Sequence, residues 1–355
     1  MKIRALTVFA PFPEEWSKSS IAELFDEALM RLGEVRDNLK NRGYDVWTMR
    51  VSLPKPPTDV YKGLVSLLPD PPRNILVSVG GLELMVASPK LVADLTEKGY
   101  YVPLHGLTRS PLEASRTASR IVHEASSRDP VLATRVGVAI HNEPIRTPYF
   151  PDSTSYAMGW SFGLGYLYND LMEKHVRKEL RFEDFVDMLE RPLSLVRSMG
   201  YTVFADLSLS PWMNDSTAKL IMSISKTGLF EPGFLSAVRF VNKIISELAA
   251  HIAWVTGFNE VMLPYAEDKV LIDEGCRGRI RAQDFLLAST VCMAGPDMLV
   301  VPADRDQLAN FILDTYTVWL TKKRPMGIRV IPVNGSPGSK VRLGKFGSPC
   351  IIPYR

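Results

Sequence analysis

The feature that most constrains the fold of this chain is a repeated alternation of short apolar runs and longer amphipathic segments. Runs rich in Val and Ile predict buried strands, and the amphipathic segments between them predict helices. Such alternation favours a mostly parallel sheet with helices outside it. Before residue 144, the predicted strands are Ile3–Ala10, Asp45–Leu53, Asn74–Val79, Tyr101–Leu104 and Arg135–Ile140.

The alternation is interrupted between Pro144 and Gly200 and then resumes. The interrupted stretch is predicted to be mainly helical, and its Gly-rich segment Gly159–Gly165 is interpreted as helix packing or a tight turn. The predicted strands after it are Tyr201–Leu207, Glu260–Leu263, Asp297–Val301 and Gly327–Val333. A closed barrel and an open sheet both fit, because the number of strands alone does not separate them.

The composition predicts a well-packed protein without a nucleic-acid or membrane signal. Of its 355 residues, 46% are hydrophobic and 23% charged, so the chain can bury a large core. The formal net charge is only +3, and Lys and Arg are scattered rather than clustered. No uncharged run is long enough to span a bilayer, and Pro11 and Pro13 interrupt the first apolar run, so no signal peptide is expected.

Cysteine and glutamine usage suggests the environment of the protein. Cys276, Cys292 and Cys350 are far apart and form no C-x-x-C pair, which favours free thiols in a reducing cytoplasm over a disulfide framework. Glutamine occurs only at Gln283 and Gln307, and depletion of thermolabile amides indicates a thermophile. We therefore expect a cytoplasmic protein.

Three apolar runs in the last hundred residues stop at Pro, Asp, Glu or Gly, where a buried strand would give way to a polar loop. They are Asn259–Glu267, Thr290–Asp304 and Gly327–Pro332. Because α/β proteins place their chemistry at such junctions, we expect the functional site there. The chain contains no Walker loop, dinucleotide-binding G-x-G-x-x-G, H-E-x-x-H or G-x-S-x-G motif, so no reaction is predicted.

Asp206, Ser208 and Ser210 alternate along and beyond a predicted strand. Residues two apart in a strand share one face, so these three side chains could line a polar pocket inside a barrel. A buried carboxylate needs a partner, which makes all three candidate ligand-binding residues and Asp206 a candidate catalytic residue. The alternative is a hydrogen-bonded structural triad at a strand end.

Asp215 and Ser216 follow Asn214 directly before a predicted helix. Their side chains could cap that helix, and its free N–H groups would favour an anion. We take Asp215 and Ser216 as candidate ligand-binding residues, with ordinary capping as the alternative.

Arg329 interrupts the apolar strand that ends near Pro332. If it faces inward, its guanidinium must meet a carboxylate or an anionic ligand, and Asp206 and Asp297 are the candidate partners. By strand alternation, an outward Arg329 in a surface ion pair is an equally good interpretation. Asp297 and Arg329 complete the set of candidate ligand-binding residues.

Two further positions carry reactive side chains without a supporting motif. Cys292 lies between a predicted helix and strand, where a thiol could serve nucleophilic or radical chemistry, but no nearby base is evident and a small buried hydrophobe is the alternative. The loop His141–Glu143, with Asp152 and Ser153 beyond it, has residue types suited to metal binding or acid–base work. Its spacing matches no metal motif, so no metal is predicted and no cofactor is assigned.

A set of motifs resembles a known family. These are Ala205–Pro211 (ADLSLSP), Leu263–Asp268 (LPYAED), Cys292–Asp304 (CMAGPDMLVVPAD), Gly327–Gly335 (GIRVIPVNG) and Gly344–Cys350 (GKFGSPC). In order and spacing they resemble the uncharacterised "domain of unknown function 711" family, also called uncharacterised protein family 0210. The resemblance implies a barrel like that of pyruvate formate-lyase and other glycyl-radical enzymes, with ten strands in two parallel five-stranded halves. It implies no established activity, and Trp212–Asn214 stands where relatives have a Gly-rich loop.

Pattern and resemblance together predict one α/β barrel domain over residues 1–355, with helices outside and the mainly helical insertion at about 144–200. Two functions remain open. The first is binding of a small anionic metabolite at the barrel mouth, and the second is a non-catalytic scaffold that acts through assembly or interaction. A deep polar cavity would favour the first, and an apolar lumen with an exposed apolar patch the second. The aromatic segment Tyr149–Tyr168 predicts a homo-oligomer interface, with plugging of the barrel end as the alternative.

Overall fold

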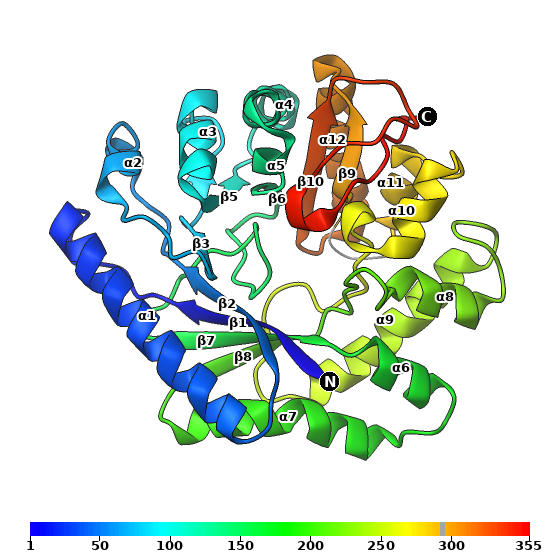
Figure 1. Ribbon diagram of the computed structural model, residues 1–355, viewed down its shortest axis with the longest axis horizontal. Coiled ribbons are helices and arrows are strands. Elements are labelled where there is room, and N and C mark those ends of the chain that lie inside the picture. The colour runs from blue at the N-terminus through cyan, green and yellow to red at the C-terminus, as the bar shows by residue number, and fades with distance from the viewer. Residues whose placement is uncertain (292–294) are drawn as a thin grey trace.

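The computed structural model describes residues 1–291 and 295–355, and within them the chain is a mixed α/β protein. The strands are β1 (Lys2–Phe9), β2 (Val46–Ser52), β3 (Ile75–Ser78), β4 (Leu82–Glu83), β5 (Tyr100–His105), β6 (Val136–Ile140), β7 (Ser161–Leu167), β8 (Thr202–Asp206), β9 (Asp297–Pro302) and β10 (Met326–Val333). Figure 1 shows the strands around the centre of the molecule and the helices at its periphery.

The α-helices follow the same chain order. They are α1 (Lys18–Asn41), α2 (Leu64–Leu67), α3 (Pro89–Lys98), α4 (Pro111–Arg128), α5 (Pro130–Ala133), α6 (Asn169–Val176), α7 (Phe182–Ser198), α8 (Thr217–Ser225), α9 (Phe234–His251), α10 (Lys269–Cys276), α11 (Ala282–Ala288) and α12 (Arg305–Lys322). Short 3₁₀ turns are η1 (Thr58–Val60), η2 (Tyr265–Glu267) and η3 (Gly344–Phe346). Among the described helices, none combines the length and apolar composition that crossing a bilayer requires.

The strands form one ten-stranded sheet in the order β8-β7-β1-β2-β3-β5-β6-β10-β9, with β4 beside β5. Strands β1, β2, β3, β5 and β6 are parallel to one another. The parallel pairs β7–β8 and β9–β10 join this group through the antiparallel pairings β1–β7 and β6–β10. Hydrogen bonds between the described residues do not close the sheet into a ring. The predicted α/β class is confirmed at this level.

Helix α1 illustrates how the sequence pattern becomes packing. Ser17 caps its first turn, because its hydroxyl accepts a hydrogen bond from the backbone N–H of Ser20. Its buried positions recur every three or four residues, which places one apolar stripe against the sheet. These positions are Ile21, Phe25, Ala28, Leu32, Val35 and Leu39. The opposite face remains polar, as expected for an outer helix.

The interpretation of Gly159–Gly165 as helix packing or a tight turn is wrong, because strand β7 begins at Ser161 and lies between β1 and β8. The glycines serve close packing within this strand. A Cβ at Gly163 would lie 2.7 Å from the Phe9 ring, and one at Gly165 would lie 2.7 Å from the Tyr149 ring. Residues 144–200 therefore supply a sheet strand as well as helices α6 and α7.

Next to β8, at the end of the strand order, the neighbouring segments form isolated bridges instead of regular strands. The predicted strand Glu260–Leu263 is reduced to an isolated parallel bridge between Leu209 and Val261. Similar bridges pair Ala205 with Val255 and Met213 with Asp268. Segments 205–213 and 255–268 thus run side by side, and they bring η2 to the interior next to β9.

The aromatic segment Tyr149–Tyr168 packs largely within its own chain. Tyr149 and Phe150 are buried, and Phe162, Tyr166 and Tyr168 are fully so. The segment therefore gives no support to an oligomer interface, and a homo-oligomer stays a prediction. The alternative, in which the segment plugs the end of a barrel, also stays a prediction.

The expectation of free thiols is wrong for two of the three cysteines, because Cys276 and Cys350 form a disulfide. Their sequence separation of 74 residues hid the pairing. The disulfide joins the segment after β10 to α10. The hydroxyl of Tyr265, in η2, also donates a hydrogen bond to the Cys350 carbonyl at 2.8 Å. Disulfides of this kind are uncommon in the cytosol of mesophiles but occur inside cells of hyperthermophiles.

Replacing both Cys276 and Cys350 with Ser is expected to lower the free energy of unfolding. Removing a cross-link that closes a loop of this length adds chain entropy to the unfolded state worth about 4 kcal/mol, within a usual range of about 0–5. Guanidinium denaturation without reductant measures the change. Wild-type protein treated with dithiothreitol should match the double variant, and an unchanged unfolding curve in both would contradict the cross-link.

Candidate functional site

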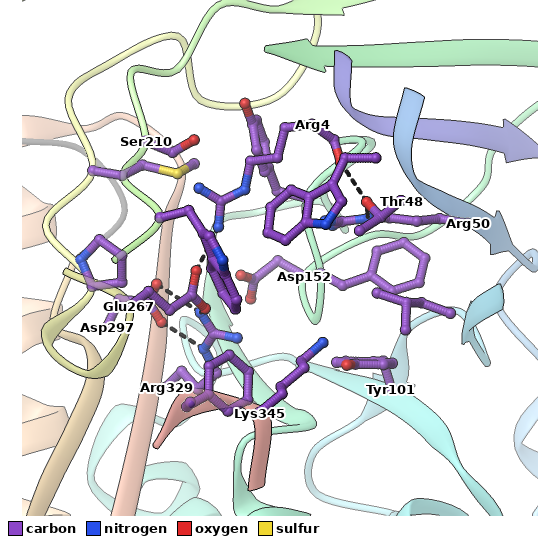
Figure 2. Close-up of a pocket in the computed structure, with 18 of the residues that line it drawn as sticks. Arg4, Thr48, Arg50, Tyr101, Asp152, Ser210, Glu267, Asp297, Arg329 and Lys345 are labelled. Carbon is purple, nitrogen blue, oxygen red and sulfur yellow. Dashed lines mark hydrogen bonds and ion pairs between the residues drawn. The ribbon is translucent and has the colours of Figure 1, made fainter. Parts of the chain in front are cut away.

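A polar cavity of about 70 Å³ lies inside the curve of the sheet. Figure 2 shows charged side chains from strands on different sides converging on it. The charged lining residues are Arg4, Arg50, Asp152, Glu267, Asp297, Arg329 and Lys345. The aromatic lining residues are Trp47, Tyr101, Tyr149, Phe150, Trp212, Phe258 and Phe346. Strands β1, β2, β9 and β10 each contribute a charged group, so the fold itself creates the site.

Arg329 on β10 is the centre of a buried ion-pair chain. Its Nε lies 2.7 Å from Asp297 Oδ1 and its Nη2 2.9 Å from Asp297 Oδ2, a two-pronged contact. The same Nη2 lies 2.8 Å from Glu267 Oε1, and the other Glu267 oxygen pairs with Arg4. Burial opposes the ionisation of Glu267, but Arg329 and Arg4 more than offset this and lower its pKa. Each charge in the chain Arg4–Glu267–Arg329–Asp297 thus has an opposite partner, although Arg4 Nε is buried without a hydrogen-bond partner among the described residues.

Arg50 on β2 is different, because it is a buried cation without an ion pair. Its side chain is 6% exposed. Its Nε donates to Thr48 Oγ1 at 3.1 Å and its Nη1 to the Pro148 carbonyl at 3.0 Å, and it lies over the Phe150 ring. In the described part of the chain, no carboxylate lies within ion-pair distance of it. Burial and the nearby Arg4 lower its pKa to about 10, so it still carries its charge at neutral pH.

Asp152 enters the cavity from the loop before β7 and is half-buried. Its carboxylate occupies a gap between β6 and β10 that exists because residues 137 and 327 are both glycine. A Cβ at either Gly137 or Gly327 would lie 2.6 Å from a carboxylate oxygen. Its Oδ1 is buried and has no hydrogen-bond partner among the described residues. Burial and the nearby Asp297, opposed by Arg329, raise the pKa of Asp152 to about 7.

Of the seven residues expected to bind a ligand, Ser210, Asp297 and Arg329 line this cavity. Arg329 points inward and is 7% exposed. Of the two partners expected for it, Asp297 pairs with it and Asp206 does not. The geometry therefore brings together the members of the expected set that come from β9, β10 and the segment after β8.

Asp206 and Ser208 lie outside the cavity and hold neighbouring loops together. Asp206 Oδ1 accepts hydrogen bonds from the Ser208 N–H and hydroxyl and from the Asn259 N–H, at 3.0, 2.6 and 3.1 Å. Its Oδ2 accepts from Thr147 Oγ1 at 2.8 Å and from the Phe258 N–H at 3.1 Å. Both oxygens are therefore occupied, which is the structural alternative considered for this residue.

Ser216 takes its structural alternative and caps the following helix, whereas the Asp215 side chain contacts Asn169 instead. Ser216 Oγ accepts from the Lys219 N–H at 2.9 Å and caps helix α8. The same hydroxyl donates to Asp268 Oδ1 at 2.6 Å, and Asp268 Oδ2 accepts from the Ala218 N–H at 3.0 Å. The negative group at this helix end is thus the chain's own carboxylate. Asp215 accepts from Asn169 Nδ2 at 3.0 Å.

The remaining candidate, Cys292, lies outside the described residues. The loop residue His141 makes only a local contact, from Nδ1 to the Glu143 carbonyl at 2.8 Å. Across residues 1–291 and 295–355, no cluster of three or more His, Cys, Asp or Glu side chains is placed to hold a metal ion.

Sequence reasoning missed Arg4, Arg50 and Glu267, and it named Asp152 only with the loop His141–Glu143, as a residue type suited to metal binding or acid–base work. A signal was present for the two arginines, because each interrupts an otherwise apolar strand, as Arg329 does. Glu267 belongs to a junction that the sequence did single out. No local pattern indicated that Asp152 would enter this cavity, because it lies in a loop and its glycine gap is formed by two strands remote in sequence.

Comparison with known proteins places these features in a family context. A family model described as uncharacterised ACR (DUF711) matches residues 111–343. A UPF0210 protein of Sulfurisphaera tokodaii is 30% identical over 148 residues, which cover 40% of this chain and 33% of the relative. Those of Pyrobaculum aerophilum and Oleidesulfovibrio alaskensis are 28% and 26% identical, over 39% and 42% of this chain and 32% and 34% of the relatives. The chain thus covers about a third of the length of these curated relatives.

Arg329→Met is expected to lower the free energy of unfolding by about 3–5 kcal/mol, because it leaves the Asp297 and Glu267 carboxylates buried without their shared partner. Equilibrium denaturation measures this. The matched control is Arg177→Met, which breaks an exposed ion pair with Glu173 and should cost less than about 1 kcal/mol. Equal losses in the two variants would contradict the anchoring role of Arg329.

Asp152 should make the protein less stable as the pH rises from about 4 to 7. In this window the folded state keeps a proton that the unfolded state has lost, so stability falls by up to about 1.4 kcal/mol per pH unit from this group. Asp152→Asn removes that loss, so the variant should gain stability relative to wild type at pH 8 but not at pH 4. Denaturation curves at both pH values test this, with the exposed Asp26→Asn as control. A stability difference that is the same at both pH values would refute it.

Proposed function

The chain belongs to the family described as uncharacterised ACR (DUF711), and we propose that it binds a small anionic metabolite in the cavity between its strands. Arg50 is the principal anion-binding residue in this proposal. Ser210 and Lys345 are the supporting groups, and the ion pairs of Arg4 and Arg329 hold the wall behind them. No reaction is assigned.

The observation that carries the proposal is the unpaired guanidinium of Arg50. A buried charge is costly unless it is paired, and a ligand carboxylate or phosphate would supply the missing partner. The planar guanidinium has N–H groups to spare, since only Nε and Nη1 have protein partners here. Guanidinium groups bind carboxylate and phosphate through two parallel hydrogen bonds, which would orient the ligand as well as hold it.

The balance of charge in the cavity also favours an anion. The lining carries the cations Arg4, Arg50, Arg329 and Lys345 against the carboxylates Asp152, Glu267 and Asp297. Because Glu267 and Asp297 are already engaged by Arg4 and Arg329, the surplus positive charge lies on the Arg50 and Lys345 side. Asp152, which titrates near neutral pH, compensates for only part of it.

The size of the cavity limits the ligand to a small metabolite. A single water needs about 10–15 Å³ of such space, so the volume corresponds to roughly five to seven waters. That excludes a nucleotide and suits an acid with few carbon atoms. The rings of Trp47, Trp212 and Phe346 would contact its apolar part.

We also propose how the strands are arranged into a domain. We propose that residues 1–355 form one barrel domain, with 144–200 as an insertion that supplies β7. We also propose two parallel halves of five strands, like those of pyruvate formate-lyase. The antiparallel pairings β1–β7 and β6–β10 support this, since they mark where one half would meet the other.

The competing proposal is a non-catalytic scaffold. Binding measurements separate the two. Isothermal titration with acetate, pyruvate and inorganic phosphate, together with mass spectrometry of metabolites that co-purify with the protein, tests for a ligand and distinguishes carboxylates from phosphate. At least one probe should bind to wild type. If none binds and nothing co-purifies, the scaffold is the better account.

Arg50→Gln is expected to weaken binding of that probe by at least about tenfold, because a charge-assisted hydrogen bond contributes about 1.5–3 kcal/mol. The control is Arg42→Gln, at an exposed arginine after α1 and outside the cavity lining, which should bind the probe as wild type does. Equal affinities for wild type and Arg50→Gln would assign the anion to another group.

A further inference from the structure

We infer that the cavity takes up its anion together with one proton, and that Asp152 is the residue that carries this proton. The inference rests on the proposed anion binding in the same cavity. In this inference two groups bind the ligand from opposite sides. The guanidinium of Arg50 forms an ion pair with it, and the protonated carboxyl group of Asp152 donates a hydrogen bond to it.

The strands around Asp152 leave a specific space for its carboxylate. Two different strands carry glycine where its carboxylate enters, and a single added carbon at Gly137 or Gly327 would overlap an oxygen of that carboxylate. The buried Oδ1 has no hydrogen-bond partner in the described part of the chain, although buried polar atoms nearly always have one. A carboxylate that serves only structure would be satisfied on both oxygens, as Asp206 is.

The neighbouring charges leave Asp152 without a partner of its own. Arg329 on β10 attracts it, but that guanidinium is already engaged by Asp297 and Glu267. Asp297 on β9 repels it, and Glu267 adds further negative charge to the same cluster. The other charged or titratable groups around the cavity are Arg4 on β1, Arg50 on β2, Tyr101 on β5, Tyr149 before β7 and Lys345 in η3. Figure 2 shows the Asp152 carboxylate directed toward the Glu267–Arg329 group.

An incoming anion changes this balance in one direction. It adds a third negative group beside Asp152 and Asp297, which disfavours the ionised form of Asp152 further. A protonated carboxyl group removes that repulsion and gains an O–H that can donate to the ligand. Because the pKa of Asp152 is already raised to about 7 by burial and Asp297, the proton is available under ordinary conditions. Anion affinity should therefore fall as the pH rises above 7.

The test is isothermal titration of pyruvate into wild-type protein between pH 6 and pH 9. Pyruvate and acetate suit this range because their carboxyl groups stay ionised throughout, whereas phosphate titrates within it. For wild type we expect the dissociation constant to rise toward tenfold per pH unit above 7. Titrations at pH 8 to 9 in two buffers with different ionisation enthalpies should show close to one proton taken up per anion, and titrations at pH 6 should show almost none, because Asp152 is already protonated there.

Asp152→Asn is the decisive variant, because its amide is the same size and is a neutral donor at every pH. Its affinity should be independent of pH and should exceed that of wild type at pH 9. The control Asp26→Asn should keep the wild-type pH dependence. Asp152→Ser, also neutral but smaller, provides a second pH-independent variant if Asp152→Asn does not fold.

The possible results distinguish proton-coupled binding from the anion binding on which it rests. If pyruvate or acetate binds to wild type with an affinity that does not change between pH 6 and pH 9, the proton-coupled inference is overturned while anion binding stands. The same holds if the wild-type pH dependence persists in the Asp152 variants. If pyruvate, acetate and inorganic phosphate all fail to bind to wild type and variants at any pH, the proposed function fails, and this inference fails with it.

Discussion

The ion-pair chain Arg4–Glu267–Arg329–Asp297 is the interaction on which the interior of this protein depends. It connects β1 through η2 with the neighbouring strands β10 and β9, which lie at the end of the strand order and are well separated from β1. Since hydrogen bonds between described strands leave the sheet open, these side chains bridge the interior where the backbone does not. Buried ion pairs recover their desolvation cost only when their geometry is good and their remaining atoms are bonded, and the two-pronged Arg329–Asp297 contact meets that condition.

The same ion-pair chain supplies much of the charge that lines the cavity. It leaves one buried lining cation, Arg50, outside the pairs. Arg4 and Arg329 are consumed by the carboxylates between them, so they form a fixed wall. Arg50 has no such partner and Asp152 has an unsatisfied oxygen, so the groups able to respond to a ligand are the two outside the chain of pairs. Aromatic side chains line the space around these two groups, and low-dielectric surroundings of that kind strengthen electrostatic interactions relative to water.

The sequence allowed much of the fold to be predicted, and the reasons for the failures are physical. Apolar runs located most strands, and a cation inside an apolar run located Arg329; the same rule would have found Arg4 and Arg50. Alternation failed for Asp206, Ser208 and Ser210, because β8 ends at Asp206 and side chains no longer alternate beyond a strand end. Strand β7 was missed because glycine is usually depleted in strands, and here it is required by the Phe9 and Tyr149 rings. Asp152 and the Cys276–Cys350 bond depend on tertiary paths that no local pattern contains.

The residues that line the cavity are far apart in the sequence, and this determines when the cavity can form during folding. The partners in the Arg4–Glu267 pair are 263 residues apart, and Lys345 is further along the chain still. Residue 267 must therefore be synthesised before Arg4 can meet its carboxylate, and such long-range closures are slow steps in folding. Until then the cation from the first strand remains solvated. The cavity thus forms only after residues separated by hundreds of positions have come together, and its appearance would report a late stage of folding.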